Sequence, residues 1–307
     1  MRPKALFAAG LLAVLCANVA MADTPGPRFL DRHAAYPEGP LLRADGLYVA
    51  EMGADRVTVY AEGRKRTYWR RNECGPTSIA PYRDGLLVLC HLAGAVAVVD
   101  ASGATAAMID RDAQGRRFRD PNDSYADGRG GVYFSDPGAF TKDSRPNGAL
   151  IYLDAAGAAR RVAAGLWYPN GVYVDQSARQ LYVSETFNRR ILRYPIREDG
   201  ALGPQEIYID IDAAAPAAPR YREPYREAGP DGLEIAPNGH LFVAMYGEGR
   251  ILEFDAQGGF LSQIRTRARY VTNLAFAPDG GFYRVGPLDN MNPPYAGEVV
   301  YQPPPHP

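Results

Sequence analysis

The sequence predicts an all-β fold, a six-bladed β-propeller with four antiparallel strands in each blade. Short runs rich in Val, Tyr, Leu, Ile and Phe alternate with Asp-Gly, Asn-Gly and Gly-Gly turns, a pattern typical of strands and hairpins. Six of these runs look alike, and each follows a segment with a similar start, at intervals of roughly 40–60 residues, the length that four short strands occupy. The six runs are 46–50, 85–89, 131–135, 180–184, 240–244 and 281–285.

The strand before each run is expected to line the central tunnel. Its start is placed in turn at Glu38, Cys74, Asn122, Asn170, Asp231 and Thr272. The last two units align without gaps, because Ala236-Pro-Asn-Gly239 matches Ala277-Pro-Asp-Gly280. Third strands are expected at 56–60, 95–99, 190–194, 250–254 and 297–301.

The segment 28–32 is expected to supply the fourth strand of the last blade, closing the ring so that no sheet edge stays open. Two stacked β-sandwiches are the alternative architecture. A sandwich, however, has no reason to repeat one strand-start motif six times.

Residues 1–22 are typical of a cleavable signal peptide, which leaves 23–307 as a single propeller domain. Arg2 and Lys4 precede an apolar run, and Ala20-Met-Ala22 is a small-residue cleavage site. We therefore expect a periplasmic or secreted protein. Lipid attachment at Cys16 is the alternative, although the preceding Leu15 is larger than the residue such sites place there.

Composition argues against two classes of partner. The formal net charge is −1, with 34 Lys and Arg against 35 Asp and Glu, so no basic excess attracts nucleic acid or an anionic membrane. No stretch after the N-terminal segment approaches the roughly 18 apolar residues of a membrane span. The oligomeric state is left open.

Four of the six strand starts carry a carboxylate or amide oxygen: Glu38, Asn122, Asn170 and Asp231. In a propeller the innermost strands run side by side around the tunnel, so these residues should converge on one mouth. Two carboxylates and two amides form a hard-oxygen set, suited to calcium or magnesium. The alternative is that Asn and Asp before Gly are simply good turn residues, but this does not explain Glu38.

Four motifs resemble a known family: Tyr36-Pro-Glu-Gly-Pro40, Arg119-Asp-Pro-Asn-Asp123, Tyr168-Pro-Asn-Gly171 and Gly229-Pro-Asp-Gly232. The chain is similar to the senescence-marker protein/gluconolactonase/LRE-like family of calcium-dependent propeller lactonases, which has as a cousin the phosphotriesterase that hydrolyses diisopropyl fluorophosphate. The resemblance implies that Glu38, Asn122, Asn170 and Asp231 bind Ca²⁺, with Mg²⁺, Mn²⁺ and Zn²⁺ as other candidates. It also implies a small-molecule lactone or ester as substrate.

Asp231 is the candidate catalytic residue, either as general base toward a water molecule or as nucleophile. The chain has no Gly-x-Ser-x-Gly elbow, no His-Glu-x-x-His and no Cys-x-x-Cys, so other hydrolytic and redox chemistries lack their usual motifs. The rival functions are a phosphotriesterase of the same fold, a condensation enzyme similar to strictosidine synthase, and a calcium-binding propeller that recognises a ligand without turnover.

Five further residues are candidates for substrate binding: Cys74, His91, Arg145, Tyr246 and Thr272. Each has a plainer interpretation. Cys74 can be half of a disulfide with Cys90, and His91 an ordinary loop histidine. Two long connections, 136–149 and 201–230, are expected on the metal face, and the second is either a lid or a passive linker.

Overall fold

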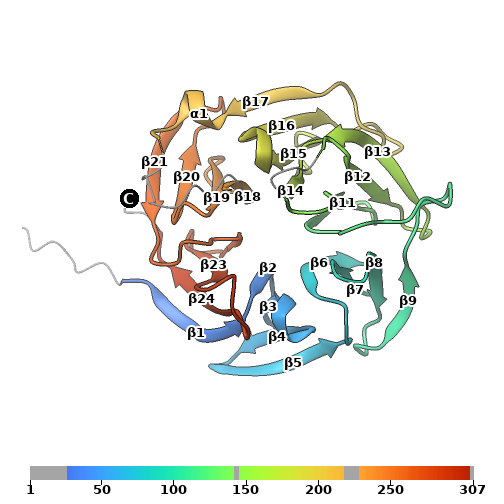
Figure 1. Cartoon of the computed structure of the whole chain (residues 1–307), viewed down its shortest axis with the longest axis horizontal. Coiled ribbons are helices and arrows are strands. Elements are labelled where there is room, and N and C mark those ends of the chain that lie inside the picture. Colours follow the sequence, from blue (N-terminus) through green and yellow to red (C-terminus); the bar gives the residue numbers. More distant parts are fainter. Residues whose placement is uncertain (1–25, 142–144, 218–227, 305–307) are drawn as a thin grey trace, which may run out of the picture.

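A computed structural model describes residues 26–141, 145–217 and 228–304 of the chain. It contains six four-stranded antiparallel sheets arranged in a ring around a central tunnel (Figure 1). This confirms the predicted six-bladed propeller. The predicted signal peptide, residues 1–22, lies outside the described residues. No helix in the described part of the chain has the length and apolar character needed to cross a membrane.

The blades are numbered from the N-terminus, and their strands are given from the tunnel outward. Blade 1 holds β2 (Pro37–Arg43), β3 (Gly46–Glu51), β4 (Arg56–Ala61) and β5 (Arg64–Arg70). Blade 2 holds β6 (Pro76–Tyr82), β7 (Gly85–Cys90), β8 (Ala95–Val99) and β9 (Thr105–Ile109). Blade 3 holds β10 (Ser124–Ala126), β11 (Val132–Asp136), β12 (Gly148–Leu153) and β13 (Ala159–Leu166).

Blade 4 holds β14 (Pro169–Asp175), β15 (Gln180–Glu185), β16 (Arg190–Pro195) and β17 (Glu206–Asp210). Blade 5 holds β18 (Gly229–Ile235), β19 (Leu241–Tyr246), β20 (Arg250–Phe254) and β21 (Phe260–Arg265). Blade 6 holds β22 (Asn273–Phe276), β23 (Phe282–Pro287), β24 (Ala296–Gln302) and, as its outer strand, β1 (Arg28–Ala35). Short helical turns are η1 (Met52–Ala54), η2 (Thr186–Asn188) and α1 (Ile211–Ala214).

The N-terminal strand closes the ring as predicted. β1 pairs antiparallel with β24, from Arg28 opposite Tyr301 to Ala35 opposite Ala296 (Figure 1). The first strand of the fold thus completes the last blade and forms the outer edge of its sheet.

Apolar side chains fill the six interfaces between neighbouring blades. Each buried cluster draws on two adjacent sheets; one, for example, joins Leu87 and Leu89 of β7 to Phe134 of β11. The middle strands are therefore covered on both faces. Double coverage explains why runs such as Gly85–Cys90 are apolar at consecutive positions instead of alternating.

The connection 201–230 differs from expectation, because it contains the outer strand β17 and the short helix α1. Most side chains of β17 are exposed or half-buried. An outer strand of this kind lacks the strong apolar pattern by which the inner strands were recognised. Part of the expected lid, 218–227, lies outside the described residues.

The structure also corrects the register of blade 2. β6 begins at Pro76, so Thr77 follows a proline at the strand start just as Glu38, Asn170 and Asp231 do. Cys74 lies two residues before the strand. Cys74 was predicted because Gly75-Pro76 was aligned with Gly39-Pro40, which follows Glu38. In the structure Pro76 instead corresponds to Pro37, so Thr77 is the residue equivalent to Glu38.

Candidate functional site

One small cavity opens where the inner strands begin, and the four predicted oxygen ligands all line it. Its volume is about 160 Å³. Glu38, Asn122, Asn170 and Asp231 come from blades 1, 3, 4 and 5, so the ring brings together residues far apart in sequence. The other lining residues are Tyr36, Met52, Thr77, His91, Phe140, Tyr168, Thr186 and Tyr246.

The charges at this mouth suit a cation. Burial raises the pKa of Glu38 well above its usual value, and the negative charge of Asp123 adds to the effect. Burial likewise raises the pKa of Asp231, and Glu38 and Asp123 add to it. Buried carboxylates that repel one another favour protons or a metal ion between them. The Oδ1 atom of Asn170 is buried and has no hydrogen-bond partner among the described residues, as expected of an amide oxygen that coordinates an ion.

The donor set therefore fits a hard divalent ion better than a soft one. Among the described residues, no group of three or more His, Cys, Asp or Glu side chains is placed to hold a metal. An ion here would depend on the two asparagine oxygens and on water beside the two carboxylates, which is the mixture that calcium accepts.

Two tyrosines enter the cavity through the same local turn. Tyr36 and Tyr168 each stand two residues before a predicted ligand, with a proline between, and both adopt left-handed backbone angles, φ 47° and 55°. This conformation is uncommon for a bulky residue and marks a constrained position. Both rings line the cavity beside the ligands that follow them.

A carboxylate at the end of a second strand fixes the backbone three residues before each of three ligands. Glu51 accepts the N–H of Ala35 (2.9 Å), and Glu185 accepts the N–H of Trp167 (2.7 Å). Asp136 accepts the N–H of Arg119 (2.8 Å). These residues precede Glu38, Asn170 and Asn122 respectively. In blades 1, 3 and 4 the second strand thus holds the segment that leads to the candidate ligand.

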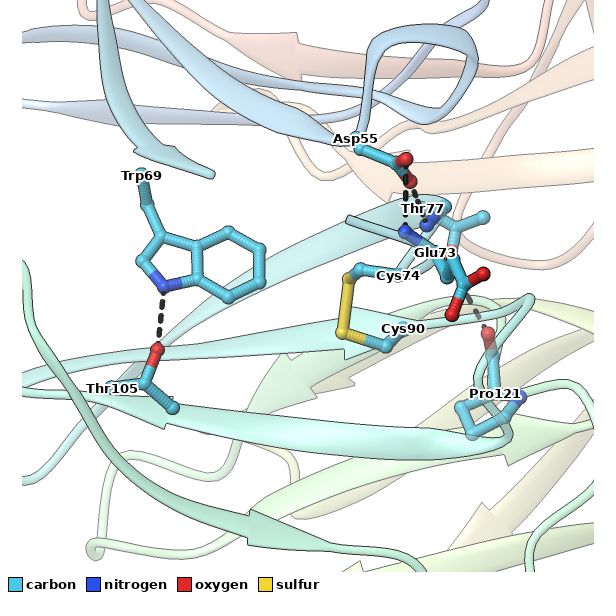
Figure 2. The surroundings of a disulfide bond; sticks show 9 residues. Asp55, Trp69, Glu73, Cys74, Thr77, Cys90, Thr105 and Pro121 are labelled. Atoms are coloured by element: carbon cyan, nitrogen blue, oxygen red, sulfur yellow. Dashed lines mark hydrogen bonds between the residues drawn. A yellow bond between two sulfur atoms is a disulfide. The ribbon is translucent and has the colours of Figure 1, made fainter. Parts of the chain in front are cut away.

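Threonine hydroxyls fix the residue directly before three ligands, and each reaches across to the next blade. Thr77 donates to the carbonyl of Pro121 (3.2 Å), as Figure 2 shows, and Thr186 donates to that of Pro230 (2.8 Å). Thr272 donates to the carbonyl of Pro37 (3.0 Å). The two strand-start positions without a ligand, 77 and 272, therefore position the ligands of their neighbours.

The structure brings His91 and Tyr246 to the cavity, but not the other three substrate-binding candidates. Cys74 is fully buried in a disulfide with Cys90 (Figure 2). Thr272 is buried and serves the backbone contact to Pro37. Arg145 is exposed and is not among the residues lining the cavity.

Of the aromatic residues that line the cavity, only Tyr246 was among the predicted substrate-binding residues. Phe140 lies in the connection after β11, and its ring centroid is 4.8 Å from that of Tyr168 and 5.8 Å from that of Tyr246. The Tyr-Pro pairs at 36–37 and 168–169 were the available signal, since each directly precedes a ligand.

The hydroxyls of Tyr36 and Tyr246 lie 3.1 Å apart, and the side-chain amide of Asn290 donates to Tyr246 (2.8 Å). Burial raises the pKa of both tyrosines, and the charges of Glu38 and Asp231 raise them further. Both hydroxyls therefore keep their protons. A single hydrogen bond between two hydroxyls uses one proton, so the pair retains one for another acceptor.

The model of the SMP-30/gluconolactonase/LRE-like region matches residues 36–281. The chain belongs to this family. The match covers five complete blades and the inner strand β22 of the sixth, and it includes all four candidate ligands. The resemblance expected from the four motifs is thereby confirmed.

The chain is similar to curated lactonases in sequence and to solved structures in fold. The lactonase drp35 of Staphylococcus saprophyticus is 28% identical over 202 residues, which is 64% of this chain and 58% of that protein. The chain thus spans less than two thirds of the length of this relative. A solved gluconolactonase from Xanthomonas campestris superposes with a TM-score of 0.71 at 22% identity, covering 92% of this chain and 96% of that one. A calcium-binding regucalcin from Agrobacterium tumefaciens gives 0.68 at 18% identity, covering 91% and 93%. At these identities the solved structures show a shared fold.

Proposed function

We propose that this protein is a calcium-dependent lactonase whose active site is the cavity at the tunnel mouth. The observation that carries the proposal is the convergence of two buried carboxylates and two amides, from four different blades, on one cavity. The family membership and the lactonase relatives support the same reaction class. Glu38, Asn122, Asn170 and Asp231 would hold the ion. When bound, a divalent cation polarises an ester carbonyl and offsets the negative charge that develops on its oxygen.

Asp231 acts as general base in the proposed reaction. Its carboxylate accepts a proton from a water molecule while the water oxygen attacks the carbonyl carbon of the lactone. The ring C–O bond then breaks, its electron pair stays on the departing oxygen, and that oxygen takes up a proton. The product is the open-chain hydroxy acid.

The hydroxyl pair of Tyr36 and Tyr246 supplies a neutral donor in this scheme. The proton that the pair does not share is available to the carbonyl oxygen as negative charge builds there. A fixed donor of this kind is worth most where water is excluded. Asn290 orients the pair from behind.

The function is tested on purified protein, stripped of metal with a chelator and assayed on a panel of lactones, an aryl ester and a phosphotriester with each divalent ion added back. We expect lactone hydrolysis that calcium restores. Asp231→Asn should lower kcat by about 10²–10⁴-fold, the usual contribution of a general base. Glu206→Gln, an exposed carboxylate on β17, is the matched control and should leave the rate unchanged.

Two outcomes would redirect the proposal. Turnover of the phosphotriester alone would favour the rival esterase chemistry. Calcium binding without turnover of any substrate would favour a recognition module.

We also propose that the protein is exported. The predicted signal peptide supports this, and so does the buried disulfide, since such bonds persist mainly in oxidising compartments. N-terminal sequencing of the protein from an expressing cell should begin at Asp23. A chain that still carries residues 1–22 in a soluble cell extract would contradict it.

A further inference from the structure

The cavity is lined by polar side chains and by a cluster of aromatic rings, which we call its aromatic wall. Phe140 sits at its centre: its ring contacts those of Tyr168 and Tyr246, and it stacks on Phe187 with 5.3 Å between centroids. Tyr36 completes the wall and is itself backed by Tyr295 at 6.0 Å. Mutual packing of this kind holds the rings in place before any ligand arrives.

Most hydroxyls around the cavity are already engaged. Thr77 and Thr186 donate their protons to the carbonyls of Pro121 and Pro230. The hydroxyls of Tyr36 and Tyr246 pair with each other, and Tyr246 also accepts from Asn290. The hydroxyl of Tyr168 has a hydrogen bond with the side chain of Asn122. Apart from the candidate ion ligands, two groups remain free among the described residues: the second proton of the Tyr36–Tyr246 pair, and Nδ1 of His91, which is buried without a partner. A site that recognises a polyhydroxylated substrate would need many more free hydrogen-bond donors and acceptors.

The protein also offers little to an anionic substrate. No lysine or arginine is among the described residues that line the cavity, whereas two carboxylates are. A divalent ion would balance those carboxylates and leave no excess positive charge for a second acid group.

The apolar character continues outside the cavity. Of six large apolar side chains that are strongly exposed among the described residues, four flank residues of the site: Leu92, Trp167, Leu288 and Met291. Leu92 follows His91, and Trp167 precedes Tyr168. Leu288 and Met291 flank Asn290, which donates to Tyr246. All four lie in connections on the face where the inner strands begin, and we call them the apolar rim.

We propose that the site selects neutral lactones that carry an alkyl or aryl substituent, in preference to sugar lactones. The proposal rests on the lactonase function proposed above. The ester group sits at the ion-binding end, and the substituent lies along Phe140 and leaves over the rim. The volume agrees, because a cavity of about 150 Å³ in another protein holds a six-membered ring, and this one measures about 160 Å³.

Two lactones with the same six-membered ring test the proposal. δ-Nonalactone carries a butyl substituent, whereas δ-gluconolactone carries hydroxyl groups. Each CH₂ moved from water to an apolar surface is worth about fourfold in an equilibrium constant, and unpaired hydroxyls oppose binding. With calcium present and the uncatalysed rate subtracted, kcat/KM should favour δ-nonalactone by at least about 30-fold.

Variants assign the preference to the wall and the rim. Phe140→Ala should reduce the ratio about tenfold by lowering kcat/KM for δ-nonalactone alone. Met291→Gln, at a residue 69% exposed and so harmless to folding, should raise KM for δ-nonalactone several-fold and leave δ-gluconolactone unchanged. Leu261→Ala is the control, because Leu261 is also an exposed apolar residue but lies on β21, away from the rim. This change should alter kcat/KM for neither substrate.

The outcomes separate the two proposals. Hydrolysis of δ-gluconolactone at an equal or higher kcat/KM would overturn the substrate preference and leave the lactonase function standing. Equal losses on both substrates in Phe140→Ala and Met291→Gln would also overturn it. Absence of turnover on both, with calcium bound, would remove the lactonase function and this inference together.

Discussion

Glu38 and Asp231 are placed where a folded protein least tolerates unpaired charge. Both are buried, which raises the pKa of each; the charge of Asp123 raises both further, and the charge of Glu38 adds to the shift of Asp231. Sites of this kind commonly reduce stability in exchange for function. Without an ion, the mouth of the tunnel should therefore be a weak point of the molecule, and binding of an ion should stabilise it.

Asp231→Asn tests this at the residue scale. Removing one of two mutually repelling carboxylates should stabilise the metal-free protein by about 1–2 kcal/mol, or a few degrees in unfolding temperature. The increase in unfolding temperature on adding calcium should shrink at the same time. Thermal unfolding with chelator and with calcium measures both effects. A variant less stable than wild type without metal would contradict the electrostatic account.

The convergence of the four candidate ligands on one cavity was predictable from sequence, because they stand near the starts of the inner strands of a repeat. Thr77 was not predicted, since the Gly-Pro pair at 75–76 suggested a register shifted by three residues. Phe140 and Asn290 reach the site from connections between strands, which carry no repeat pattern. The connection 136–149, which carries Phe140, was expected on this face, but the contacts of Phe140 and Asn290 in the site follow only from the assembled blades.

At the scale of the elements, the ligand segments are held by contacts that repeat around the ring. Carboxylates at the ends of second strands act within a blade, and threonine hydroxyls act between blades. The strands themselves followed from apolar periodicity. The threonine contacts could not be predicted, because their partners lie 44 to 235 residues away in sequence.

Thr186→Val isolates one inter-blade contact. It keeps the shape of the side chain but leaves the carbonyl of Pro230 without its donor, so Asp231 loses one constraint. We expect calcium affinity to fall about tenfold, with a loss of stability of about 1–2 kcal/mol. Thr186→Ser, which retains the hydroxyl, should restore affinity.

Calorimetric titration with calcium provides the measurement. Thr105→Val is the control, because Thr105 accepts a hydrogen bond from Trp69 far out in blade 2 (Figure 2). If Thr105→Val and Thr186→Val weaken calcium binding equally, Thr186 has only a general structural role.

For the whole molecule, the ring is held by a clasp between β1, the outer strand of blade 6, and blade 1. Asp31 of β1 accepts hydrogen bonds from Lys65 (2.7 Å) and Tyr60 (2.9 Å) of blade 1, and from the N–H of His33. Burial alone would raise the pKa of Asp31, but these hydrogen bonds and the charge of Lys65 outweigh it and lower the pKa.

The clasp should make stability depend on pH in a defined direction. A carboxyl whose pKa is lower in the folded state stabilises fully above its unfolded pKa, about 3.9, and loses the effect as pH falls through the folded value. Asp31→Asn should therefore cost about 1 kcal/mol at pH 7, since Lys65 is half exposed. The difference from wild type should vanish well below pH 4.

Urea unfolding at pH 7 and at pH 3 measures this difference. Asp84→Asn, in an exposed turn, is the control. A cost that does not change with pH would show that the charge of Asp31 is not what closes the ring.

The proposed active site requires a single cation that is shared by four blades. A crystal of the calcium-loaded protein, measured where calcium scatters anomalously, tests this directly. We predict one anomalous peak in the cavity, within bonding distance of oxygens from Glu38, Asn122, Asn170 and Asp231. An empty cavity under saturating calcium, or a peak there that touches only one of these side chains, would contradict it.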